Sequence, residues 1–274
     1  SSRRRHTRYI SVTGVQTCAL PICPHGFDHF CNYLNGLESS YVIIGGGAAS
    51  ILMEDEGLEF RATKDVDLVV LSRSDELNAR ILSYVKDGGY ITKEATEGSP
   101  RYYRFREPTK KDCPALIEVF ARNELNLDIQ DGQYIIPIHD DAVERLSAIL
   151  LDDEYFEIIQ KNLVTSQSGI PLINALANIC LKARAHRELF DRKAAGDKNV
   201  DEKSIQKHLK DIWRIAAVLT GDEEISLTGQ PLKDITSAIG KLDQLPDGQF
   251  KQVMEKTPNL KKDIIMTTLK QIFL

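Results

Sequence analysis

One segment, residues 41–71, constrains the fold of this chain more than any other part; it reads YVIIGGGAASILMEDEGLEFRATKDVDLVVL. It opens with a short apolar run at 41–44, of the kind found in buried strands, and then turns at the three glycines 45–47. A helix is expected from residue 48 to about residue 56, and a second strand is expected over 65–71. The pattern therefore predicts a strand, a glycine turn, a helix and a returning strand.

Two aspartates, Asp65 and Asp67, stand two residues apart at the start of the second predicted strand. Side chains at i and i+2 of a strand point to the same side, whereas on a helix they point to nearly opposite faces. In a strand the two carboxylates therefore converge beside the glycine turn. Hard oxygen ligands on one side and close backbone approach on the other suit a divalent metal with a bound phosphate. The alternative is a pair of strand-edge charges that limit aggregation.

The glycine run, Gly45, Gly46 and Gly47, has three interpretations. It could be a nucleotidyltransferase turn whose backbone N–H groups meet a triphosphate, or a plain turn from strand to helix. It could also be a dinucleotide fingerprint, because Gly45, Gly47 and Ser50 approximate the spacing G-x-G-x-x-G. A dinucleotide fold places its ribose-binding acid at the end of the second strand, but here both acids precede the apolar run. This placement argues against the dinucleotide site.

The rest of the chain changes from a mixed pattern to a helical one near residues 137–141. Before that point we expect helices at 26–40 and 75–86 and strands at 90–93, 101–106 and 115–121. After it we expect helices at 142–151, 153–163, 171–193, 200–220, 232–242, 248–256 and 260–273, with Pro171 in a first turn. The prediction is an α+β fold in which a mixed β-sheet domain with flanking helices, at 23–140, precedes an all-helical C-terminal domain at 141–274.

Glu118 lies inside the predicted strand at 115–121, where a lone carboxylate is costly to bury without a charged partner or a metal. It is therefore the best candidate for a third carboxylate beside Asp65 and Asp67. The alternative is a salt bridge with Arg104 or Arg106 on the neighbouring predicted strand.

Two parts of the sequence together resemble a known family. The glycine run followed by Arg61, Thr63, Asp65 and Asp67 is similar to the polymerase-beta type of nucleotidyltransferase, and most closely to the AbiEii-like toxins of type IV toxin–antitoxin systems. Downstream, PLINALANICLKARA at 171–185 and KHLKDIWRIAAVL at 207–219 resemble the C-terminal helices of that family. The resemblance covers residues from about 25 to about 220.

The resemblance implies a metal-dependent transfer of a nucleotide from NTP to an acceptor hydroxyl. Two Mg²⁺ ions, roughly 3.5–4 Å apart in such sites, would be held by Asp65, Asp67 and Glu118, which are also the expected catalytic residues. The expected nucleotide-binding residues are Gly45, Gly46, Gly47, Thr63, Lys64, Lys182 and Asp211. For Lys182, as for Arg184 and Arg187 on the same predicted helix, the alternative is a solvated helix face.

The implied acceptor is the 3′ end of tRNA or a protein hydroxyl, and the implied partner is a cognate antitoxin in a toxin–antitoxin or phage-defence pair. Two alternatives stay open. One is a small-molecule nucleotidyltransferase that modifies an aminoglycoside-like substrate. The other is a catalytically degenerate member that acts as a nucleotide-binding or interaction protein.

Composition adds few limits. Residues 1–22 carry four arginines and no acidic residue, and they resemble the translation of a sequencing adapter. We therefore expect them to lie outside the fold; a basic nucleic-acid-binding tail is the alternative.

Without those arginines, 31 basic and 40 acidic residues remain, a formal net charge of −9 that gives nucleic-acid binding no support. The five cysteines lack C-x-x-C spacing, and no apolar run approaches membrane-span length. We therefore expect reduced cysteines, a cytoplasmic location and no membrane partner.

Overall fold

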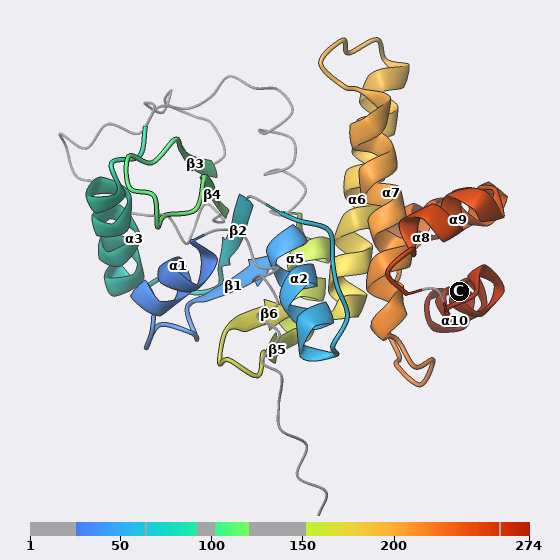
Figure 1. The fold of residues 1–274 in the computed structure, drawn as a ribbon, viewed down its shortest axis with the longest axis horizontal. Coiled ribbons are helices and arrows are strands. Elements are labelled where there is room, and N and C mark those ends of the chain that lie inside the picture. Colours follow the sequence, from blue (N-terminus) through green and yellow to red (C-terminus); the bar gives the residue numbers. More distant parts are fainter. Residues whose placement is uncertain (1–25, 64, 92–101, 121–151, 258) are drawn as a thin grey trace, which may run out of the picture.

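The computed structural model describes residues 26–63, 65–91, 102–120, 152–257 and 259–274. Within these ranges the protein is α+β, with one mixed six-stranded sheet and nine α-helices (Figure 1). Among the same residues, no helix combines the length and the apolar character needed to cross a membrane.

The sheet has the strand order β3-β4-β2-β1-β6-β5. Its strands are β1 Tyr41–Ile44, β2 Asp65–Val70, β3 Tyr102–Arg106, β4 Leu116–Phe120, β5 Leu163–Thr165 and β6 Pro171–Ile173. The pairs β2–β4 and β1–β6 are parallel, and the other three pairs are antiparallel. All four residues of β1 are buried, which explains why this central strand is a continuous apolar run.

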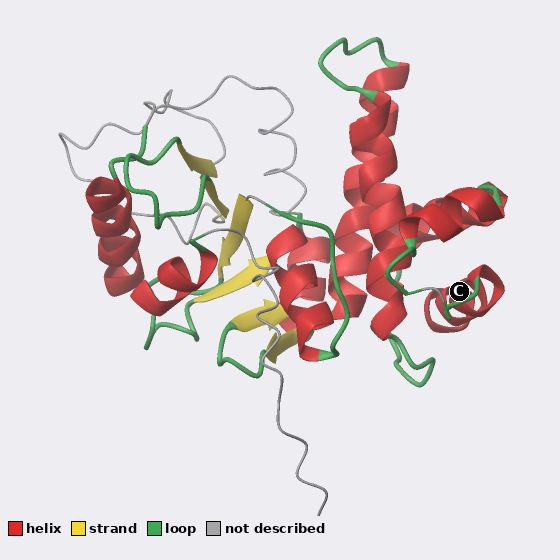
Figure 2. Ribbon diagram, in the orientation of Figure 1, coloured by secondary structure: helices red, strands yellow, loops and turns green. Residues whose placement is uncertain are grey.

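Helices flank the sheet on two sides (Figure 1). They are α1 Phe27–Tyr33, α2 Gly45–Asp55, α3 Asp75–Gly88, α5 Asp153–Lys161, α6 Ala175–Ala194, α7 Glu202–Ile215, α8 Gly229–Gln244, α9 Asp247–Val253 and α10 Lys262–Phe273, with a 3₁₀ turn at Ala216–Val218. Helices α1 and α3 lie on one side of the sheet, and α2 and α6 lie on the other (Figure 1). Figures 1 and 2 show helices α6 to α10 gathered at one end of the molecule, with α2 between them and the sheet. One continuous core of buried apolar side chains joins the sheet to these helices.

Most of the predicted elements are confirmed, but two differ in the first half of the chain. The glycine turn is shorter than expected, because α2 begins at Gly45 and includes Gly46 and Gly47 in its first turn. The predicted strand at 90–93 is limited, among described residues, to an isolated bridge between Ile91 and Arg106. The predicted helix at 142–151 and the adapter-like segment at 1–22 lie outside the described residues.

The expectation that Pro171 begins a helix is wrong. Residues Pro171–Ile173 form the buried strand β6, which pairs with β1 through Leu172 and Ile43. The helix starts only at Ala175, after Asn174, whose side chain caps it by accepting from the backbone N–H of Ala177. The predicted domain boundary between residues 140 and 141 lies outside the described residues. The expectation of an all-helical segment at 141–274 is wrong, because β5 and β6 lie in it and complete the same sheet.

Candidate functional site

A row of charged side chains crosses the sheet from β3 to β1. Arg104 pairs in register with Glu118, Glu118 pairs with Asp67, and Asp67 pairs with Ile44 at the end of β1. Residues that are directly opposite on neighbouring strands present their side chains on the same face of the sheet. The row therefore brings Asp67 and Glu118 together and leads to the glycine run that follows Ile44.

The Asp67 carboxyl group is crowded. Burial, the neighbouring carboxylate of Glu118 and a hydrogen bond with that side chain raise the pKa of Asp67 well above its ordinary value. The charge of Lys182 opposes this increase in pKa, while Asp65 adds to it. Asp65 occupies the same face of β2 as Asp67, as the strand prediction required.

Glu118 also forms an ion pair with Arg104, whose Nε lies 3.2 Å from Glu118 Oε1. This is one of the two salt bridges named as the alternative to a metal-binding role. Both interactions occur at once, since Glu118 lies between Arg104 on one side and Asp67 on the other. The ion pair leaves Glu118 next to Asp67 and does not remove it from the carboxylate pair.

The glycine run approaches Asp67 so closely that a side chain would not fit. Gly45 has a φ of +67°, in the left-handed region that favours glycine, and a Cβ at this position would collide with Asp67 Oδ2. A Cβ on Gly46 would lie 2.7 Å from Cγ2 of Thr63. Gly47 faces a different environment, because a Cβ there would meet Phe27 and Ile43 in the core.

Helix α2 starts at this glycine run without a side-chain cap. The first backbone N–H groups of an α-helix have no acceptor within the helix, and together with the helix dipole they favour anions. The chain thus places uncapped helix N–H groups next to the Asp67–Glu118 pair. This arrangement can bind a phosphate beside two carboxylates.

A buried cluster of charges lies on helices α6 and α7. Asp211 is fully buried, and its two oxygens share the single Nε–H of Arg61 at 2.9 and 3.2 Å. It also accepts a hydrogen bond at 2.7 Å from Arg61 Nη2. Arg214 Nη1 donates to it at 3.0 Å, and Lys182 Nζ lies 3.5 Å away. Burial alone would raise the pKa of Asp211, but these three cations lower it to about 2.

Lys182 is only 6% exposed, so the solvated-face alternative is wrong for this residue. Burial lowers the pKa of Lys182, whereas the charges of Asp211 and Asp67 raise it. The alternative holds for Arg187, which is exposed and pairs with Asp191 one turn further along α6. Lys182 therefore lies between the carboxylate row of the sheet and the charge cluster of α7.

Two polar residues on α6 and α7, Asn178 and His208, are not among the predicted site residues. Asn178 on α6 is fully buried, and its Nδ2 donates to the Gly45 carbonyl at 3.0 Å. His208 on α7 has a buried Nδ1 without a hydrogen-bond partner among the described residues. Burial is the main cause that lowers the pKa of His208 to about 3, and the charge of Lys182 is the second. The spacing of Asn178 and Lys182, four residues apart on one helix, was the available signal for Asn178.

The structure brings most of the predicted site residues together in two sets. Asp67, Glu118, Gly45 and Gly46 meet beside the junction of β1 and α2, in the middle of the sheet, with Thr63 against Gly46. Lys182 and Asp211 pair with each other on α6 and α7. Lys64 lies outside the described residues.

Among the described residues, no group of three or more His, Cys, Asp and Glu side chains is arranged to hold a metal ion by itself. The donor chemistry still fits Mg²⁺, which proteins often bind through one or two carboxylates together with the phosphates of a substrate. Asp67 and Glu118 supply such a pair, and their crowding is of the kind that a cation relieves. Asp65 is a further carboxylate on this face of β2, and its charge adds to the raised pKa of Asp67.

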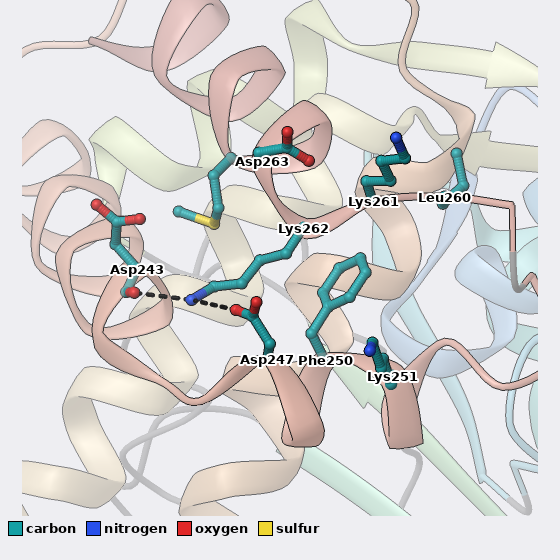
Figure 3. A pocket seen from close by; sticks show the side chains of 9 residues that line it. Asp243, Asp247, Phe250, Lys251, Leu260, Lys261, Lys262 and Asp263 are labelled. Atoms are coloured by element: carbon teal, nitrogen blue, oxygen red, sulfur yellow. Dashed lines mark hydrogen bonds and ion pairs between the residues drawn. The ribbon is translucent and has the colours of Figure 1, made fainter.

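A cavity of about 640 Å³ lies elsewhere, between α8, α9 and α10 (Figure 3). Phe250 and Met266 lie in its wall, and Lys262 Nζ donates to the carbonyl groups of Asp243 and Leu245 at the end of α8. These bonds satisfy carbonyl groups that the helix leaves free at its C-terminus. Lys262 therefore has a structural role here, and the cavity is separate from the carboxylate row.

Comparison with known proteins gave no match to any protein-family model and no significant match to a curated protein sequence.

Proposed function

We propose that this chain is a metal-dependent nucleotidyltransferase. The acceptor hydroxyl oxygen attacks the α-phosphorus of an NTP, the bond from that phosphorus to the bridging oxygen breaks, and pyrophosphate leaves. The proton of the hydroxyl passes to a carboxylate of the site. Catalysis of this kind depends mainly on positioning and on neutralising phosphate charge.

One observation carries the proposal: the carboxylates of Asp67 and Glu118 are adjacent, and the backbone of Gly45 lies directly against Asp67 at the uncapped start of α2. A plain strand-to-helix turn has no need for a carboxylate pressed against a left-handed glycine. A phosphate-binding helix start beside a metal-binding carboxylate pair accounts for both features.

Each residue then has a defined task. Asp67 and Glu118, with Asp65, would hold Mg²⁺, which when bound supplies charge neutralisation for the attacking and leaving oxygens. Of the two paired carboxylates, Glu118 is the one that would take the proton from the acceptor hydroxyl. Lys182, held by Asp211, presents a positive charge toward Asp67 and toward the phosphates of the nucleotide.

Arg61 links the two sets of charges. Its guanidinium group donates to Asp211, and its Nη2 would lie 3.9 Å from a Cβ on Gly46. A guanidinium group in this position can bind a phosphate oxygen and keep its bond to Asp211, since it carries five N–H donors. The long loop before β2 is thereby attached to α7 at the place where phosphates would enter.

The resemblance stated above extends the proposal to an AbiEii-like toxin with a cognate antitoxin. On that basis the acceptor is the 3′ end of tRNA or a protein hydroxyl, and the protein acts in the cytoplasm without a membrane partner. The test is to incubate the purified protein with labelled NTPs, Mg²⁺, total cellular RNA and total protein. Label in one defined RNA or protein species is expected, and no label in either pool would contradict the toxin proposal.

A further inference from the structure

The buried amide of Asn178 connects two parts of the chain that lie 133 residues apart in sequence. Its Nδ2 donates to the carbonyl of Gly45, the residue whose backbone lies against Asp67. The orientation of the amide follows from this partner, because a carbonyl oxygen can only accept, so the nitrogen must face it. The amide oxygen, Oδ1, is then left buried without a hydrogen-bond partner among the described residues.

A fully buried side chain with an unpaired oxygen is a poor choice for stability alone. A buried acceptor without a partner loses its hydration and gains nothing in return, and an apolar residue of similar shape avoids this cost. Nearby positions on α6 are filled by buried apolar side chains, as at Ile179, Leu181 and Ala183. The amide therefore needs an explanation other than packing.

Asn178 and Lys182 are four residues apart on α6, so they lie on the same face, one turn from each other. Asn178 binds the glycine run, and Lys182 acts on Asp67 through its charge. Helix α2, which begins at that glycine run, packs against α6 (Figure 1). A fixed bond from Asn178 to Gly45 therefore also fixes where Lys182 stands relative to Asp67.

We propose that Asn178 is a positioning residue for nucleotide transfer: its amide fastens the glycine run to α6 and so holds Gly45, Asp67 and Lys182 in one arrangement. The proposal rests on the function proposed above. Gly45 needs such support because its left-handed conformation and its close contact with Asp67 leave little freedom to adjust. Loss of the bond lets the start of α2 move away from the carboxylates and the lysine.

The test compares Asn178→Leu, which has nearly the same shape and no polar atoms, with the parent and with Ile179→Val as a matched control. Ile179 is the buried neighbour of Asn178 on α6, and trimming it loosens packing without removing the amide. Three quantities are measured: the melting temperature, hydrogen exchange in the peptide spanning residues 41–53, and kcat and KM for transfer.

We expect Asn178→Leu to melt at or above the temperature of the parent, with faster exchange at the start of α2. Its kcat should fall by about 10²-fold, the loss expected when reacting groups are displaced by about 1 Å, while KM changes little. Ile179→Val should lower the melting temperature and leave both exchange at 41–53 and kcat near the parent values.

Parent-like exchange and parent-like kcat in Asn178→Leu would overturn the proposal. A lower kcat accompanied by a lower melting temperature would also overturn it, because general destabilisation would then explain the loss of activity. If the parent transfers no nucleotide to any acceptor, the proposed function fails. Hydrogen exchange still decides in that case whether Asn178 holds the glycine run.

Discussion

Asp67 on β2 and Glu118 on β4 stand directly opposite each other on parallel strands, with their carboxyl groups within hydrogen-bonding reach. Two carboxylates at this distance repel each other when both are ionised, so one proton is held more tightly than usual. The raised pKa of Asp67 is the result. A bound cation would relieve the repulsion between the two carboxylates, so this site is suited to bind one.

Asp67→Asn should abolish transfer without unfolding the protein. The raised pKa means that the folded state keeps a proton which the unfolded state releases above pH 3.8, so this group stabilises the protein at low pH. That contribution is lost as the pH rises through the folded-state pKa. Chemical denaturation at several pH values should show Asp67→Asn at least as stable as the parent at pH 7, and the two should converge near pH 4.

A variant that unfolds at pH 7 would contradict this prediction, because it would show that Asp67 has a structural salt bridge. Asp191→Asn is a suitable control, since Asp191 is exposed and forms an ion pair with Arg187 on its own helix. Such exposed pairs contribute about 0.3–0.5 kcal/mol.

Asp211→Asn should destabilise the protein by about 3–5 kcal/mol, the usual cost of removing one partner from a buried ion pair. Asp211 is fully buried and faces Lys182, Arg61 and Arg214, which would be left without their shared anion. Because the pKa of Asp211 is lowered to about 2, its contribution is complete above pH 3.8 and is lost as the pH falls toward 2. Urea denaturation at pH 7 and pH 3 should show the difference between the two proteins shrinking at the lower pH.

Lys182→Met should weaken NTP binding by about tenfold or more, since hydrogen bonds to charged groups contribute about 1.5–3 kcal/mol. Arg61 and Arg214 still neutralise Asp211 in this variant, so the protein should stay folded. The increase in melting temperature produced by Mg²⁺-NTP measures the binding. Lys203→Met, at an exposed position on α7, is the control, and equal stabilisation by NTP in both variants would remove Lys182 from the site.

Gly45→Ala should cost more stability and more nucleotide binding than Gly57→Ala. The two glycines have nearly the same φ, +67° and +70°, so both variants carry the same backbone strain, about 1 kcal/mol. Only at Gly45 would the added methyl collide with Asp67, whereas it would meet nothing within 4 Å at Gly57. Equal melting temperatures for the two variants would show that the glycine run is not held against Asp67.

The sequence was most informative where local pattern and burial agree. The strands β1 and β2 and the same-face placement of Asp65 and Asp67 follow from an apolar run and a spacing of two, and both are confirmed. The adjacency of Glu118 to Asp67 needed one further step, the assignment of a lone buried acid to a strand.

Other features depend on contacts that no local pattern records. The pairing of Arg61 with Asp211 spans 150 residues, and the fold alone brings the two together. The sequence predicts helix at Pro171, Leu172 and Ile173 because these residues run directly into an apolar helical pattern. Only the pairing with β1 makes them a strand. Asn174 marked the true helix start, as an N-cap residue three positions before the N–H that it binds.

We propose above all that this protein transfers a nucleotide and that it does so at Asp67. The most direct measurement incubates the parent and Asp67→Asn with Mg²⁺, cellular RNA and protein, and NTP labelled either at the α-phosphate or at the γ-phosphate. The parent should attach the α-label to an acceptor and release the γ-label as pyrophosphate, and folded Asp67→Asn should do neither. Attachment of the γ-label, or full transfer by Asp67→Asn, would contradict the assignment.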